Sequence, residues 1–464
     1  MKIIFKSIFI IIISFSFQSC FVAKDYERPE NIVDEANYRT ENIETDTANV
    51  AKLSWRDVFE DEQLQTYIEE SLENNQDIRI ALQQIRAANA YFKQGKAGYY
   101  PSVNINGTYT HQELAPNSQF GSFFSSLDQY ELNASLSWEA DIWGKIRSNK
   151  RAFQAQYLQT QAAHKAVKTE LIANVASAYF QLMALDEQIK TTETTIENRK
   201  NSLEVTKALK DAGNVNSVAV NQTKAQLHTA EAILLDLKNE SRLLENTMSI
   251  LLGKAPEEIE RNSLDSQTMN NSLMTGVPSG LLENRPDVIQ AEYAFINAFE
   301  MTNVAKSNFY PSITISATSG FQSLSLSDFI SGNSIFATFI GGLTQPIFNR
   351  RQIKTEYEVA QSEQEQALLN FEKTLIIASK EVSDALLNYE NAKQKIEVKT
   401  NEYEAYQTAV EDSEELLKNG LVNYLEVLNA RENSLNTKLD LINVELSQYN
   451  SMIELYRTLG GGWQ

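Results

Sequence analysis

Cysteine and histidine are nearly absent from this sequence, which has one cysteine and three histidines in 464 residues. A single cysteine cannot form a disulfide within the chain, and the scattered histidines match no metal-binding spacing. No combination of serine, histidine and aspartate points to nucleophilic catalysis either. We therefore expect no enzyme activity, no catalytic residues, no metal and no bound cofactor.

Basic residues are in the minority, with 41 lysines and arginines against 61 acidic residues and a net charge of -20. Proteins that bind nucleic acid need a basic surface to face the phosphates. We therefore expect no nucleic-acid partner.

Long apolar runs are missing except near the N-terminus, where residues 8–17 are nearly all apolar. That run is too short to span a bilayer as a helix. Lysines before it and a serine–cysteine pair after it are typical of a signal peptide. We expect residues 1–19 to be a lipoprotein signal peptide and Cys20 to carry a covalent lipid, with Phe21 favouring the outer membrane. A plain signal peptide with an incidental cysteine is the alternative.

Glycine and proline are scarce, with 17 and 8 residues, so long intervals without them stand out. Two such intervals are rich in Ala, Gln, Glu, Lys and Leu, which favour helices. We expect helices over about residues 144–211 and 349–418. At ~1.5 Å per residue each would span roughly 100 Å, which is wider than a globular core and requires a bundle or a tube.

A second, shorter helix is expected after each long one, over about residues 215–252 and 422–459. Their apolar residues recur at spacings of three and four, which is the seam of a coiled coil. Gly213 and Gly420 stand at the two junctions, and glycine adopts positive φ without strain. We therefore expect a tight turn at each glycine, with the shorter helix packed along the longer one.

Four segments alternate between apolar and Ser/Thr/Asn residues, which is the period of a β-strand. We expect strands over about residues 101–112, 129–142, 311–322 and 334–346. No segment after Cys20 is apolar enough for a transmembrane helix, so a membrane crossing would require a closed barrel. Strands of this length and pattern suit an outer-membrane barrel, and a soluble sandwich with one wet face is the alternative. Three chains would give twelve strands and four would give sixteen, and spacing leaves both open.

The chain repeats itself at an offset of 210 residues: "YYPSVNINGTYT" at 99–110 returns as "FYPSITISATSG" at 309–320. The fold expected is mainly α with a membrane β-barrel, built as a tandem repeat of helix, β-hairpin and two long helices. The expected parts are the arm 20–60, the first repeat 61–253, the linker 254–280, the second repeat 281–460 and the tail 461–464.

Three segments carry a resemblance to a known family: "DYERP" at 25–29, "LLENRPDV" at 281–288 and "LYRTLGGGW" at 455–463. With them the chain resembles the TolC-like outer-membrane efflux proteins, in the lipoprotein branch of OprM and NodT. The resemblance implies a homotrimer with one twelve-stranded barrel in the outer membrane and a long periplasmic α-barrel. It also implies a passive exit duct that docks on a periplasmic adaptor protein and an inner-membrane pump.

The same resemblance implies a gate at the periplasmic tip, formed by Leu425, Glu426 and Asn429. Asn429 stands where relatives often have an aspartate, so we expect a less acidic ring. The alternative for Leu425 is that it packs in the apolar seam between helices. The alternative for Glu426 is that it is an ordinary solvated surface charge. The expected contacts with the adaptor are the two tip turns, Gly213, Asn214, Val215, Gly420, Leu421 and Val422.

A non-conducting protein is the rival hypothesis: a lipid-anchored periplasmic coiled coil that acts as a scaffold or adaptor. Such a protein would explain the long helices and Cys20. It would not explain the four amphipathic strands, so we favour the transport duct.

Overall fold

The computed structural model describes residues 22–29, 54–267 and 284–463. The expected signal peptide and Cys20 lie outside these ranges, as do most of the arm and part of the linker. The chain divides into two compact units. The first comprises residues 1–30, 85–160 and 291–371, and the second residues 31–84, 161–290 and 372–464.

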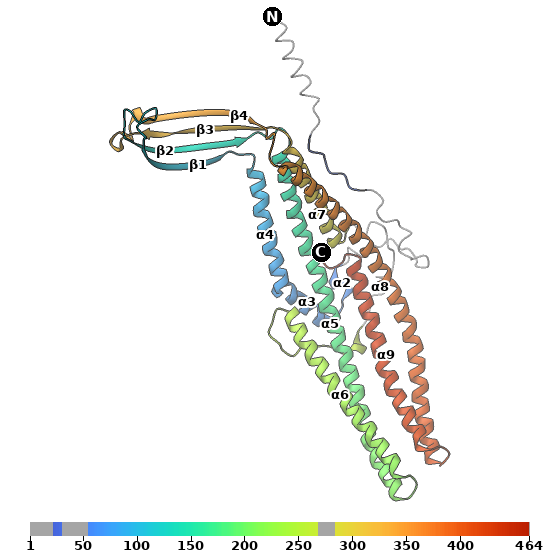
Figure 1. Cartoon of the computed structure of the whole chain (residues 1–464). Coiled ribbons are helices and arrows are strands. Elements are labelled where there is room, and N and C mark those ends of the chain that lie inside the picture. The colour runs from blue at the N-terminus through green and yellow to red at the C-terminus, as the bar shows by residue number, and fades with distance from the viewer. Residues whose placement is uncertain (1–21, 30–53, 268–283, 464) are drawn as a thin grey trace. The chain divides into compact units, whose positions relative to one another are not determined.

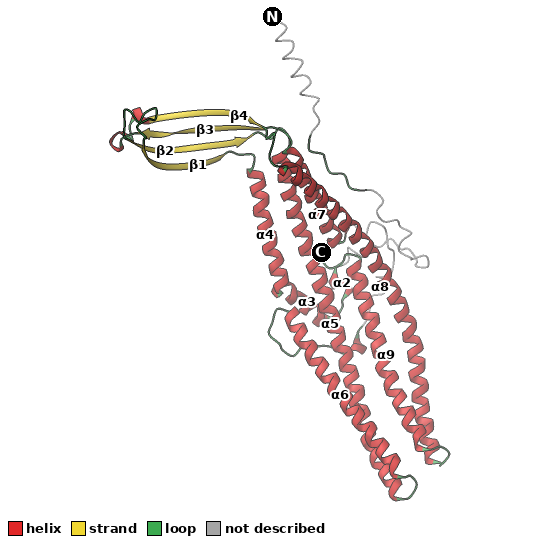
Figure 2. Cartoon of the chain, viewed as in Figure 1, coloured by secondary structure: helices red, strands yellow, loops and turns green. Residues whose placement is uncertain are grey.

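The first unit contains one antiparallel sheet of four strands in the order β1-β2-β3-β4 (Figure 2). The two hairpins join through β2 and β3, which pair from Tyr130↔Ser323 to Glu139↔Thr314. Within the described residues, the outer edges of β1 and β4 have no partner strand. The strands are β1 (Ser102–Glu113), β2 (Ser126–Glu139), β3 (Ser312–Ser323) and β4 (Ile335–Thr344).

The second strand lies three residues upstream of its expected range of 129–142, because each end is decided by contacts that alternation does not reveal. At its start, pairing with β1 continues to Glu113↔Ser126. At its end, the Asp141 carboxylate accepts the backbone N–H groups of Ile146 and Arg147, at 2.8 and 2.9 Å. Those groups belong to the first turn of the next helix, so Asp141 serves as a cap and not as a strand residue.

The helices repeat in length as well as in order. The two long helices have 67 residues each, and the two that follow them have 35 each (Figure 1). No helix within residues 22–29, 54–267 and 284–463 is long and apolar enough to cross a membrane. The helices are α2 (Trp55–Val58), α3 (Glu62–Asn74), α4 (Gln76–Ala97), α5 (Lys145–Asp211), α6 (Ser217–Leu251), α7 (Pro286–Ser307), α8 (Gln352–Lys418) and α9 (Tyr424–Thr458).

Arg285, from the "RPD" segment, ties three helices of the second unit together. Its guanidinium is almost fully buried and makes two hydrogen bonds to Asp287, at 3.0 and 2.8 Å. It also donates to Glu381 on α8 and to the Thr458 carbonyl oxygen at the end of α9, at 2.7 and 3.2 Å. Burial alone would raise the pKa of Asp287, but the bonds with Arg285 outweigh it and hold that pKa below its ordinary value.

Candidate functional site

The two tip turns share one backbone conformation. Gly213 has φ +79° and Gly420 has φ +69°. In both turns the N–H of the next residue donates to the carbonyl oxygen five residues back, at 2.9 Å, which is the Schellman arrangement. A Cβ atom at either glycine would meet nothing within 4 Å. Glycine is therefore needed for its positive φ and not for close packing.

An asparagine caps the helix after each turn. Asn216 Oδ1 accepts the N–H groups of Val218 and Ala219, at 3.0 and 3.2 Å. Asn423 Oδ1 accepts the N–H groups of the second and third residues of α9, at 2.9 and 3.3 Å. Because the asparagines cap the helices, α6 and α9 begin two residues later than the expected 215 and 422.

The three expected gate residues lie in the first two turns of α9. Leu425, Glu426 and Asn429 are all exposed, and the exposed fraction of Leu425 is 47%. The buried side of the same turns is formed by Tyr424, Val427 and Leu428. Leu425 therefore stands outside the buried seam, and packing within the chain does not account for it.

The first turns of α6 and α9 contact each other directly. Ala219 on α6 packs with Tyr424 and Leu428 on α9, and Val215 adds to the edge of this cluster. The Thr223 hydroxyl donates to the Tyr424 hydroxyl at 3.1 Å. The two hairpins of one chain are thus joined at their tips by both apolar packing and a buried hydrogen bond.

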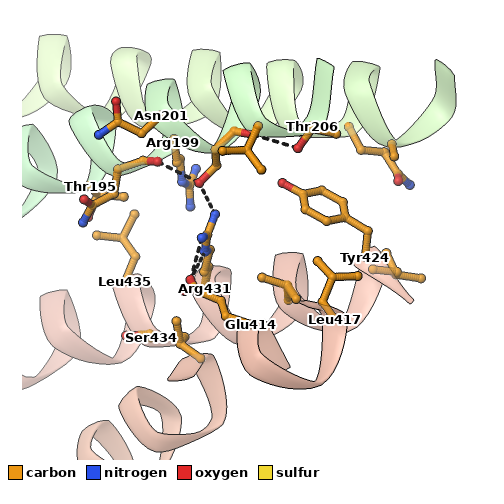
Figure 3. Close-up of a pocket in the computed structure, with 18 of the residues that line it drawn as sticks. Thr195, Arg199, Asn201, Thr206, Glu414, Leu417, Tyr424, Arg431, Ser434 and Leu435 are labelled. Atoms are coloured by element: carbon orange, nitrogen blue, oxygen red, sulfur yellow. Dashed lines mark hydrogen bonds and ion pairs between the residues drawn. The ribbon is translucent and has the colours of Figure 1, made fainter. Parts of the chain in front are cut away.

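Two arginines strengthen this junction, one from each hairpin. Arg199 on α5, whose side chain is 4% exposed, pairs with Glu432 on α9 at 2.9 Å. Arg431 on α9 pairs with Glu414 on α8 at 3.0 Å (Figure 3). It also donates to the Ser202 hydroxyl on α5. Each of the hairpins α5–α6 and α8–α9 therefore contributes one arginine whose guanidinium contacts the other hairpin.

A groove of about 1540 Å³ lies between the two hairpins. Its lining includes residues of both tip turns. The Arg431 and Glu414 pair and Tyr424 also line it (Figure 3). Leu425 also borders the groove, whereas Glu426 and Asn429 do not. The expected gate residues and the expected adaptor turns are thus gathered at one end of one unit.

The family model described as outer membrane efflux protein matches residues 67–254 and 277–461. The chain belongs to the outer membrane efflux protein family. This confirms the family resemblance, the assignment to the outer membrane and the transport role. It favours the duct over the non-conducting scaffold, which the family description does not fit.

Relatives of this efflux family match nearly the whole chain. The cation efflux system protein CusC of Escherichia coli O6:H1 is 29% identical over 455 residues, covering 97% of this chain and 98% of the relative. The probable outer membrane lipoprotein SilC of Salmonella typhimurium is 27% identical over 444 residues, covering 95% of each chain. A crystal structure of CusC is similar with a TM-score of 0.86 and 27% identity, over 96% of this chain and 100% of that chain. The mainly helical fold with its small antiparallel sheet is therefore that of the outer membrane efflux proteins.

Sequence reasoning missed the residues that join the hairpins of this efflux protein. Arg199 carried a signal, because it lies three residues after Ile196 and four before Leu203, at a seam position between two apolar residues. A polar residue at a seam position often fixes register. Nothing in the pattern indicated that its partner would be Glu432, 233 residues away.

Proposed function

We propose that the chain is one of three identical copies that form a passive exit duct through the outer membrane. In this proposal each copy gives four strands to a twelve-stranded barrel and its helices to a periplasmic α-barrel. The duct receives cargo from a periplasmic adaptor protein and an inner-membrane pump, and it carries out no chemical step. Cys20 carries a lipid that adds a membrane anchor.

The sheet is the observation that carries the proposal. β1, β2 and β3 are mostly apolar on one face and polar on the other, as in Val103↔Leu136 against Asn104↔Ser135. β4 departs from this pattern, because its Phe336 and Ile340 lie on the polar face. A strand edge with unpaired N–H and C=O groups is unstable in a bilayer. The free edges of β1 and β4 are therefore satisfied if β4 of one copy pairs with β1 of the next, which closes a barrel.

Exposed apolar residues on α6 support the same assembly. Leu235, Leu243 and Ile250 lie eight and seven residues apart, so they share one side of the helix. Their exposed fractions are 71%, 58% and 67%. A heptad-like stripe this open in a single chain is suited to packing against a helix of a neighbouring copy.

The tip is the proposed gate and docking end. Three copies of Leu425, Glu426 and Asn429 would meet near the axis, where carboxylates repel and a leucine ring blocks passage. The adaptor would contact the turns at Gly213, Asn214, Val215, Gly420, Leu421 and Val422. Leu421, which is 71% exposed, offers an apolar contact there.

Single-channel recording in planar bilayers tests the duct. The detergent-solubilised protein should have about three times the chain mass and should conduct ions in discrete steps. A monodisperse monomer with full helical content, or a trimer without conductance, would contradict the proposal.

The gate has its own variant pair. Leu425→Ala combined with Glu426→Ala should raise the conductance, lower cation preference and make cells more sensitive to large antibiotics. Glu404→Ala, which removes an exposed carboxylate from α8, is the matched control. A double variant that conducts like the control would place the gate elsewhere on the tip.

A further inference from the structure

The polar face of the sheet is almost free of charge. By the alternation of side chains, the residues of β2 on this face include Gln129, Glu131, Asn133 and Glu139. On the other strands, the polar residues of this face include Ser102, Asn104, Asn106, Thr108, Thr110, Gln112, Thr314, Ser316, Thr318, Gln322, Thr338 and Thr344. β4 also places Phe336 and Ile340 on this face, and neither carries a charge. The four strands place two carboxylates on this face, and no lysine, arginine or histidine of these strands accompanies them.

The two carboxylates differ in their partners. Glu139, at the end of β2, forms an ion pair with Lys145 at 3.1 Å, so its charge is balanced locally. Glu131 lies in the middle of the strand, opposite Thr108. Across the described ranges of the chain, no ion pair involves Glu131. Its charge is therefore the unbalanced one on the polar face.

Neutral amides hold the Glu131 carboxylate in place. Asn133 donates to Glu131 Oε1 at 2.6 Å, and Gln129 donates to Oε2 at 3.5 Å. Asn133 is itself fixed by Asn106 on β1, which donates to Asn133 Oδ1 at 3.2 Å. Asn133 is 8% exposed, unlike most residues of this open sheet. The network orients a negative charge without neutralising it.

We propose that Glu131 gives the pore a cation preference at the level of the sheet. The inference rests on the proposed duct, in which the polar face lines the lumen and three copies of Glu131 form a ring. Rings of carboxylates favour cations in channels. At physiological salt a charge acts over about 8 Å, so the ring biases the ions near the wall of a wide lumen without closing it.

Zero-current potentials across bilayers with a KCl gradient measure the preference. Glu131→Gln should lower the permeability ratio of K⁺ to Cl⁻ by about two-fold at low salt, and the effect should fade near 1 M KCl as screening sets in. Glu131→Asp, which keeps the charge, should retain most of the parent ratio.

Asp128→Asn is the matched control. Asp128 lies on the same strand but three residues away, on the apolar face, where it contacts His111 at 2.7 Å. Its replacement should leave the permeability ratio unchanged. A change as large as that of Glu131→Gln would overturn the assignment of the polar face to the lumen.

A second variant covers the case in which Glu131→Gln does not assemble. Thr108→Lys places a positive charge directly opposite Glu131, where it can form a cross-strand ion pair with the carboxylate. It should lower the permeability ratio of K⁺ to Cl⁻ as Glu131→Gln does. Conducting variants of either kind with the parent ratio would refute the role of Glu131 while leaving the duct intact. A parent protein that does not conduct would instead refute the duct and this inference together.

Discussion

The hairpins α5–α6 and α8–α9 have the same helix lengths, the same glycine turn and the same asparagine cap, yet their second helices are packed very differently. α9 has 14 buried residues, whereas α6 has seven, although both helices are 35 residues long. The heptad pattern is present in both. Equal local patterns therefore do not lead to equal burial, and the chain covers one of its two copies far more completely.

Aromatic packing at the C-terminal half of α9 explains much of the difference. Tyr449 stacks on Phe180 of α5 with ring centroids 4.5 Å apart. Tyr456 meets Phe59 edge to face at 6.0 Å. At the matching positions α6 has Arg242 and Ser249, which bring no aromatic ring, and its Leu243 and Ile250 are exposed. The chain thus closes its own core around α9 and leaves one side of α6 open.

The largest effect is expected where the closed helix is anchored. Arg285→Met should destabilise the protein by about 3 kcal/mol, because it removes the charged hydrogen bonds of the buried guanidinium to Asp287 and Glu381, each worth about 1.5–3 kcal/mol. Arg242→Met removes an arginine from an exposed position on α6 and should change stability by less than about 0.5 kcal/mol. Denaturant unfolding followed by circular dichroism gives both values. Similar losses in the two variants would mean that α6 is held as firmly as α9.

The junction between the hairpins should come next. Arg199→Met removes a charged hydrogen bond to Glu432 and one to the Gln226 carbonyl oxygen, at a cost of roughly 2–3 kcal/mol. The loss should be local, so amide exchange should accelerate at the starts of α6 and α9 before it changes near Arg285. Arg199→Lys keeps the charge but not the double contact, and should fall between the parent and Arg199→Met. Uniform acceleration along both helices would contradict a local junction.

A smaller effect is expected on the exposed side of α6. Leu243→Ala removes apolar surface there, and it should weaken the proposed trimer by about 2 kcal/mol for each contact between two copies. Its effect within one chain should be small, because the side chain is exposed there. The ratio of trimer to monomer in detergent, measured by light scattering over a dilution series, reports the change. Glu404→Ala, which removes an exposed carboxylate from α8, is the control and should leave the ratio near that of the parent.

The smallest effect is expected at the two turns, where the hairpins are most alike. Gly213→Ala and Gly420→Ala each force a Cβ into the left-handed region, at a cost of about 1 kcal/mol. Since neither site has a neighbour within 4 Å, the two costs should agree. Thermal unfolding of the single variants checks this. A much larger loss for one of them would show that its turn is constrained by something beyond its own backbone.

The sequence by itself determined the local elements of this protein. Three local patterns indicated four long helices, two turns and four strands: the spacing of glycine and proline, the heptad spacing of apolar residues, and the period of two in the strands. Each pattern depends only on neighbours within a few residues. The end of β2 and the starts of α6 and α9 differ from the expected positions, because Asp141, Asn216 and Asn423 cap helices. The sequence pattern does not distinguish a capping residue from one that continues the strand or helix.

Only the tertiary structure decided which distant residues meet. The pairing of β2 with β3, the bond between Arg199 and Glu432 and the contacts of Arg285 all join segments far apart in the sequence. Such contacts depend on how whole helices and strands pack, and no local period records the partner. For the same reason, α6 and α9 share one pattern and yet differ in burial: exposure is set by what the rest of the chain places against a helix.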